Sequence, residues 1–260
     1  ACCLAYSRYM GDYLLTGIPK LSVCIPAYDM NGLGATYLGE SFRTLENQNL
    51  TDFEVIVSDQ SGDNDVFELC KAWGERLNLH HYWNRYGKRQ ASANVNYALR
   101  KARGAVYKVL FQDDFILSKT VLQDILDAFE GEGAMWLLKG SGVTRNGQTI
   151  EHPMVPRLTP KLHFGKNTVS SPSVLAFRAS SEHFFDENLI WLMDVEFYAR
   201  LWKDYGDPII LPDTLIANRL HADQVSPKVD RSIQKRELDY VLRKSTSFTQ
   251  ISGYLEYAKR

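Results

Sequence analysis

Short apolar runs and longer amphipathic stretches alternate along the first half of the chain. The runs are rich in β-branched residues, as is typical of buried strands, and they cover residues 21–25, 53–58, 79–83 and 106–111. Between them, residues 37–48, 66–77 and 91–103 have the spacing of one apolar helix face. Strands that alternate with helices are typical of a mainly parallel sheet covered by helices. The pattern therefore predicts an α/β fold.

The second half of the chain is less regular. It predicts a helix over 119–129 with Ser118 as its N-cap, a helix over 194–202, and short strands near 135–139, 174–177, 209–211 and 215–220. Between 141 and 173, seven glycines and prolines interrupt any regular element. Long loops in compact domains are typical of lids or binding loops. We expect an N-terminal arm over 1–20, one main domain over 21–226 and a helical tail over 227–260.

Composition and charge narrow the function classes. The chain has 260 residues, of which 45% are apolar and 23% charged, and this excludes disordered and collagen-like proteins. Its 30 basic and 31 acidic residues argue against a protein that coats nucleic acid, since such binding needs clustered positive charge. Small molecules are the favoured partners.

The chain predicts a cytoplasmic protein. It contains no apolar run of the roughly 18 residues that a membrane-spanning helix needs. Residues 1–20 lack the basic and then apolar order of a signal peptide, so we expect neither a leader nor an anchor there. The four cysteines form no CxxC pair, which favours reduced thiols.

Two adjacent carboxylates, Asp113 and Asp114, follow the apolar run 106–111. In open α/β sheets ligands bind beyond the carboxyl ends of the strands, where these residues would lie. Hard oxygen ligands suit Mg²⁺ or Mn²⁺ shared with phosphate oxygens. A solvated strand end or a helix cap would use the same residues, so the pair alone leaves both interpretations open.

Three further residues could carry chemistry. Asp59 follows a strand and either contacts a base or ribose or closes an Asx turn. Asp194 begins an amphipathic helix, where a carboxylate serves as a cap or as a general base. His221 follows a predicted strand and is either structural or a metal ligand.

The order of these motifs resembles family 2 of the nucleotide-sugar glycosyltransferases, over roughly residues 20 to 226. The matching segments are LSVCIPAY (21–28), VSDQSGD (57–63), residues 84–96, FQDDF (111–115), SPSVLAFR (171–178), MDVEFYARL (193–201) and LHADQVS (220–226). The resemblance implies a single Rossmann-like domain of the GT-A type, with a nucleotide-binding half over 21–112 and a metal and acceptor half over 113–226.

The resemblance also implies roles for individual residues. The nucleotide contacts would be Pro26, Ala27, Tyr28, Asp59, Arg85 and Asp113. The ligands of a Mn²⁺ or Mg²⁺ ion would be Asp114 and His221, and the catalytic carboxylate would be Asp194. Ser171 and Ser173 would lie near the sugar and the acceptor.

Three positions depart from the usual family pattern. Gln112 stands where the first Asp of the metal motif often is, Met193 replaces the Glu of a Glu-Asp pair, and Asp29 replaces an Asn. A Gln before two Asp residues still leaves oxygen ligands for a metal. We therefore interpret the departures as changes in donor specificity.

The function implied is inverting transfer of a sugar from a nucleoside diphosphate, with UDP the favoured carrier, to a hydroxyl of a saccharide or lipid-linked acceptor in polysaccharide synthesis. A nucleotidyltransferase is one alternative, although the loop after the first strand, residues 26–34, has no Lys or Arg to hold a triphosphate. A non-catalytic sugar-nucleotide binding module is another.

The tail carries the one basic region, with eight basic and four acidic residues between 228 and 260. One interpretation is peripheral contact with anionic lipid at the inner face of a membrane. The other is a helix that packs on the domain or pairs two copies of the chain. The apolar stripe of Leu238, Val241 and Leu242 favours packing.

Overall fold

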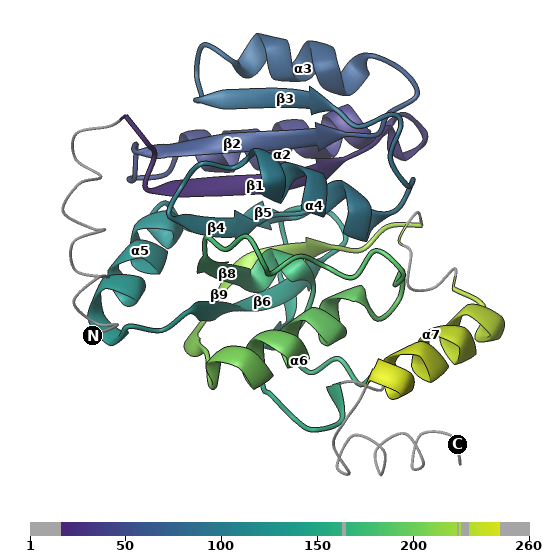
Figure 1. Cartoon of the computed structure of the whole chain (residues 1–260). Coiled ribbons are helices and arrows are strands. Elements are labelled where there is room, and N and C mark those ends of the chain that lie inside the picture. The colour runs from purple at the N-terminus through teal and green to yellow at the C-terminus, as the bar shows by residue number, and fades with distance from the viewer. Residues whose placement is uncertain (1–16, 163–164, 223, 225–228, 245–260) are drawn as a thin grey trace.

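Within the part of the chain that the structure describes, nine strands form one sheet with helices on both faces (Figure 1). The computed structural model describes residues 17–162, 165–222, 224 and 229–244. Its strands are β1 Leu21–Ala27, β2 Phe53–Asp59, β3 Leu79–Trp83, β4 Val106–Val109, β5 Phe115–Ile116, β6 Trp136–Thr144, β7 Glu151–Met154, β8 Leu175–Arg178 and β9 Ile209–Arg219. Its helices are α2 Gly34–Glu46, α3 Asp65–Trp73, α4 Ala91–Lys101, α5 Val121–Glu132, α6 Met193–Tyr205 and α7 Arg231–Lys244, with 3-10 turns η2 Met30–Gly32 and η4 Pro172–Val174.

The N-terminal half is a parallel sheet in the order β3-β2-β1-β4. Every residue of β1 and β2 is buried, because helices cover both faces there. Crossovers between parallel strands are right-handed, so α2 and α3 cover one face and α4 the other once the chain reverses after β3. In Figure 1, α4 lies in front of the sheet and α2 behind it. The reversal opens a ligand-binding crevice at the carboxyl ends of β1 and β4.

The C-terminal half adds mixed pairings. β8 runs antiparallel to both β4 and β6, β9 pairs in parallel with β6, and β5 closes the far edge. The structure corrects the expectation of an irregular stretch over 141–173, because β6 continues to Thr144 and β7 pairs with it. Residues 141–144 of β6 pair with β9, although Gly142 is among them.

Two more expectations are corrected here. The strands expected at 209–211 and 215–220 are one strand, β9, because the register shifts around Gly140 absorb the irregularity at Pro212. The N-cap residue of α5 is Thr120 and not Ser118, which was expected there. The Ser118 hydroxyl accepts a hydrogen bond from the backbone N–H of Thr120. The elements expected in the first half are all present.

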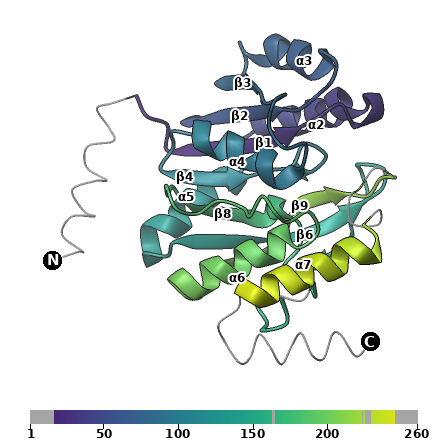
Figure 2. The ribbon, with the colours of Figure 1, turned by 45° about the vertical axis from the view of Figure 1, so that its right-hand side comes forward.

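The tail helix α7 packs on the domain through Leu238 and Val241, which are both buried. Figure 2 shows α7 lying beside α6. Residues 245–260 of the expected tail and 1–16 of the expected arm lie outside the described residues. Of the four cysteines, Cys24 and Cys70 are buried free thiols, as expected, and Cys2 and Cys3 fall in the part that is not described.

Gly140 marks the close approach of β6 to β9. A Cβ atom at this position would lie 2.2 Å from the Pro212 carbonyl oxygen and 2.6 Å from that of Asp213. We expect Gly140→Ala to lower the free energy of unfolding by about 1–3 kcal/mol, measured by urea denaturation. Gly131 in α5 has open space around its Cβ position, so Gly131→Ala is the matched control and should raise stability by about 0.5–1 kcal/mol. Equal stability of both variants would contradict the close approach.

Candidate active site

Two adjoining cavities lie at the carboxyl ends of the strands. The β1-side cavity, of about 440 Å³, is bordered by Pro26, Gln60 and Gln112, and the α6-side cavity, of about 410 Å³, by Asp194 and His221. Their shared walls are formed by Tyr28, Arg89, Gln90, Ala91, Phe111 and Asp113. The cavities therefore form one crevice, at the place that the topology predicts for a ligand.

Asp114 is a buried carboxylate at the base of this crevice. Its Oδ1 accepts a hydrogen bond from the backbone N–H of Arg219 (3.1 Å) and its Oδ2 accepts one from the Ser171 hydroxyl (3.0 Å). Burial and the neighbouring charge of Asp113 raise the pKa of Asp114 to about 7, against these hydrogen bonds, which lower it. Asp114 thus joins the end of β4 to β9 and to the loop before η4.

Asp113 faces the cavities, where its Oδ2 lies 2.9 Å from Nε2 of His221. His221 comes two residues after the end of β9 and its ring packs against that of Tyr37, with centroids 5.5 Å apart. A carboxylate and an imidazole on one cavity wall are a donor set that suits Mn²⁺. Within the described part of the chain, no three His, Cys, Asp or Glu residues gather as a ready-made metal cluster. The carboxylate of Asp113 and the imidazole of His221 are donor types that fit a divalent cation.

Gln112, which departs from the metal motif, connects two loops through its side-chain hydrogen bonds. Its Oε1 accepts from the backbone N–H of Tyr28 (2.5 Å) and its Nε2 donates to the Tyr28 carbonyl (2.9 Å). An ionised aspartate could accept but not donate, so only an amide satisfies both groups. Asp29 plays a related part, since its Oδ2 accepts from the Gly62 N–H (3.1 Å) after β2.

Asp194 lies at the start of α6 and lines the α6-side cavity. Its Oδ2 accepts from the Asn167 side chain (2.7 Å) and its Oδ1 from the Val195 backbone N–H (2.7 Å). Burial raises the pKa of Asp194 to about 6, and the charge of Glu237 adds to this, while the hydrogen bonds oppose it. A carboxylate with this pKa, on a cavity wall, can accept a proton near neutral pH.

Other residues predicted from the sequence lie outside the two cavities. Asp59 is fully buried and its Oδ2 pairs with Nε2 of His81 (2.8 Å). The Arg85 guanidinium stacks over the Trp83 ring at 3.5 Å. Ser173 is fully buried, and its hydroxyl accepts a hydrogen bond from the backbone N–H of Phe111 (2.9 Å). Ser171, in contrast, lines the α6-side cavity. Pro26, Tyr28, Asp113, Asp114, Ser171, Asp194 and His221 do line the crevice, and Ala27, at the end of β1, is fully buried.

Sequence reasoning missed several residues of the crevice. Arg89 borders both cavities and donates to the Gln60 carbonyl (3.1 Å). Its signal was its place in the matching segment 84–96. Asn167, which orients Asp194, lies in the loop that the glycine and proline pattern indicated as a binding loop. Trp191 and Asn218 carried no sequence signal and reach the site through the fold.

Comparison with known sequences gives a direct match. The sequence profile described as Glycosyl transferase family 2 matches residues 22–189, well over half of the chain. The chain belongs to glycosyl transferase family 2. The resemblance inferred from its motifs is thereby confirmed, and so is the expectation of a glycosyltransferase at the level of the family.

Curated relatives of this family 2 chain include two bacterial transferases. GalNAc(5)-diNAcBac-PP-undecaprenol beta-1,3-glucosyltransferase from Campylobacter jejuni is 29% identical over 117 residues, which are 44% of this chain and 36% of that protein. Poly(ribitol-phosphate) beta-N-acetylglucosaminyltransferase TarS from Staphylococcus aureus is 25% identical over 145 residues, 55% of this chain and 24% of its own. The chain thus spans well under half the length of these relatives.

Solved structures confirm the GT-A type of fold. TarS residues 1–349 from S. aureus, in complex with UDP-GlcNAc, superpose with a TM-score of 0.69 at 18% identity, covering 90% of this chain and 69% of that one. The mannosyltransferase PcManGT from Pyrobaculum calidifontis, in complex with GDP-Man and Mn²⁺, gives a TM-score of 0.65 at 15% identity, covering 98% of this chain and 76% of that one.

Over the residues that the structure describes, no helix is both long and apolar enough to cross a membrane.

The two hydrogen bonds of Gln112 give a test of how the crevice is held. We expect Gln112→Glu to lower the free energy of unfolding by about 1–3 kcal/mol at neutral pH, because the Tyr28 carbonyl loses its donor. Urea denaturation measures the change. Gln148→Glu makes the same replacement at an exposed position and is the control. If the two variants were equally stable, Gln112 would not be locking the loops.

Proposed function

We propose that this family 2 chain transfers a sugar from a UDP-sugar to a hydroxyl of a saccharide or lipid-linked acceptor, with inversion at the anomeric carbon. The observation that carries the proposal is the α6-side cavity, which is lined by Asp113 and His221 and also by Asp194. One site thus combines groups for a departing diphosphate with a base for an incoming hydroxyl.

The donor end would be held by the crevice between β1 and β4. The nucleoside would occupy the β1-side cavity, against Pro26 and Tyr28, and Arg89 borders both cavities where the diphosphate would lie. Asp113 and His221 would hold a divalent cation, and Asp114 would join them through the lone pairs left by its two hydrogen bonds. The cation would neutralise charge that grows on the leaving diphosphate.

Asp194 would act as the general base. A sugar hydroxyl is a poor nucleophile at neutral pH, and loss of its proton to Asp194 as it attacks makes it a competent one. The Asn167 amide and the Val195 N–H hold the carboxylate in place from two sides, which limits it to the wall of the cavity. Direct attack by the acceptor leaves no covalent intermediate, so the anomeric centre inverts, as in two-carboxylate inverting glycosidases.

The nature of donor and acceptor is inferred from the relatives. TarS residues 1–349 were solved with UDP-GlcNAc, which supports a UDP-sugar. The Campylobacter protein is named for a undecaprenol-linked acceptor and TarS for a polymeric one. An acceptor of the first kind would bring this domain to the inner face of a membrane, and the exposed Arg231, Lys235, Arg236 and Arg243 of α7 suit such a surface.

Nucleotide binding tests the donor end. In a thermal-shift screen of UDP, GDP, dTDP and CMP, we expect UDP with Mn²⁺ to stabilise the protein most, by about 2.7 kcal/mol at 100 times its dissociation constant. Asp113→Asn should lose the Mn²⁺-dependent part of the shift, whereas Asp127→Asn, on the exposed face of α5, should keep it. No shift with any nucleotide would contradict the donor end.

The role of Asp194 predicts a distinct kinetic result. Asp194→Asn should lower the transfer rate by about 10²–10⁴-fold while UDP binds as before, because only the proton acceptor is lost. In the wild type, activity should fall below a pH of about 6, because the raised pKa of Asp194 means that the base is protonated there and ionised above it. A binding module would show no transfer to lose, and an active Asp194→Asn variant would exclude the proposed base.

A further inference from the structure

A buried carboxylate from α7 reaches the segment that precedes α6. Glu237 is 1% exposed. Its Oε1 accepts from the backbone N–H of Ile190 (2.8 Å), and its Oε2 accepts from those of Trp191 and Leu192 (both 2.9 Å). A single side chain therefore satisfies three consecutive backbone donors that are 45 to 47 residues earlier in the chain.

These three donors need such a partner. They come just before the first turn of a helix, where backbone N–H groups lack partners within the helix. Leaving them buried without an acceptor would be costly, and a negative charge at this end of α6 also interacts favourably with the helix dipole. The segment 190–192 is thus fixed in place by the carboxylate of Glu237.

The segment matters because of what it carries. Ile190, Trp191 and Met193 line the α6-side cavity, and Asp194 follows directly. On the cavity side, Asn167 holds the Asp194 carboxylate, and on the far side Glu237 holds the backbone before it. Neither contact is available from α6 itself.

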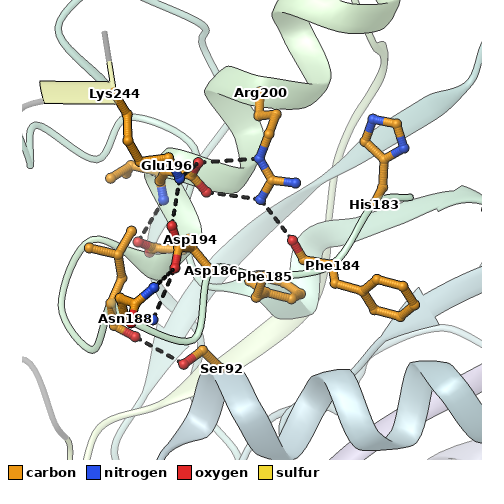
Figure 3. Close-up of polar contacts among 12 residues, drawn as sticks. Ser92, His183, Phe184, Phe185, Asp186, Asn188, Asp194, Glu196, Arg200 and Lys244 are labelled. Atoms are coloured by element: carbon orange, nitrogen blue, oxygen red, sulfur yellow. Dashed lines mark hydrogen bonds and ion pairs between the residues drawn. The ribbon is translucent and has the colours of Figure 1, made fainter. Parts of the chain in front are cut away.

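Further contacts seat α7 along its length. Lys244 Nζ donates to Asp186 (2.5 Å) and to Glu196 in α6 (3.0 Å), and the Tyr240 hydroxyl donates to Asp186 (2.9 Å). Figure 3 shows Lys244, Asp186 and Glu196 meeting beside the start of α6. Because α7 is fixed at this second point, Glu237 presents its carboxylate in one position.

We propose that Glu237 is a positioning residue for the transfer reaction: it holds the backbone of 190–192 so that Asp194 and Trp191 keep their places on the cavity wall. The inference rests on the proposed role of Asp194 as base. It gives the tail helix a function in catalysis, separate from any contact with lipid or a second copy.

Hydrogen exchange and kinetics of Glu237→Gln test the proposal. The amide side chain retains one acceptor atom and loses the other, so we expect backbone amides of 190–192 to exchange about tenfold faster, with the rest of the domain unchanged. With UDP-GlcNAc and Mn²⁺, and water as acceptor, kcat should fall by about 10- to 100-fold because a misplaced base reacts slowly. The dissociation constant of UDP should stay within about twofold, since the donor end lies on other elements.

The control is Glu75→Gln, which makes the same replacement at an exposed position after α3 and should change none of these quantities. Wild-type kcat in Glu237→Gln, with or without faster exchange, would overturn the proposal. So would an equal loss of kcat and of UDP affinity, which indicates general destabilisation. Failure of the proposed function looks different, because then the wild type itself would release no sugar or Asp194→Asn would remain active.

A second variant covers the case in which Glu237→Gln does not fold. Glu237→Asp keeps both acceptor oxygens and the charge but shortens the side chain by one methylene group. We expect partial rescue, with kcat between those of the wild type and Asp194→Asn, and faster exchange confined to 190–192. Unchanged exchange in a folded Glu237→Asp variant with reduced kcat would overturn the positioning role.

Discussion

The buried carboxylate of Asp114 constrains the whole site. A carboxylate at the carboxyl end of a central strand must find donors, since leaving it unpaired in a buried position is costly. Its donors are the Arg219 backbone, at the end of β9, and the Ser171 hydroxyl. The Ser41 hydroxyl of α2 donates to its carbonyl oxygen. Asp114 therefore adds a second link between the two halves of the sheet, beside the pairing of β4 with β8, and Asp113 and His221 line the cavity next to it.

The surroundings of Asp194 are built differently. Asp194 lies at the start of a helix, and the segment before it, 179–192, contains no strand, so its place depends on side chains that are distant in sequence. Asn167 reaches it from the loop between β7 and η4, and Glu237 reaches its backbone from α7. The proposed donor end thus depends on sheet hydrogen bonds, and the proposed acceptor end depends on a few side-chain hydrogen bonds. Burial raises the pKa of Asp194 in these surroundings. The hydrogen bonds from Asn167 and Val195 oppose this rise only in part.

How far the sequence predicted this structure depends on the range of the interactions involved. The parallel half was predictable because period and burial are local signals, and the place of Asp113 followed from a strand that ends in carboxylates. The continuous strand β9 was not predictable, because its pairing past Pro212 depends on a register shift in β6. Gln112 appeared only as a departure from a motif, and its bonds to Tyr28 require the two loops to be seen together. Nothing in the sequence marked Glu237 as buried, because a buried glutamate in a basic tail has the same local pattern as an exposed one.

The family match ends before three residues that lie in α6, after β9 and in α7. The profile covers residues 22–189, which include Asp113, Asp114 and Asn167 but end before Asp194, His221 and Glu237. The part that the profile matches therefore carries β1, β4 and the carboxylates Asp113 and Asp114, and the proposed base and the helix α7 follow it in the chain. In the proposed reaction an acceptor would meet Trp191 and Asp194, so a change in α7 would act on them through Glu237 and leave β1 and β4 in place.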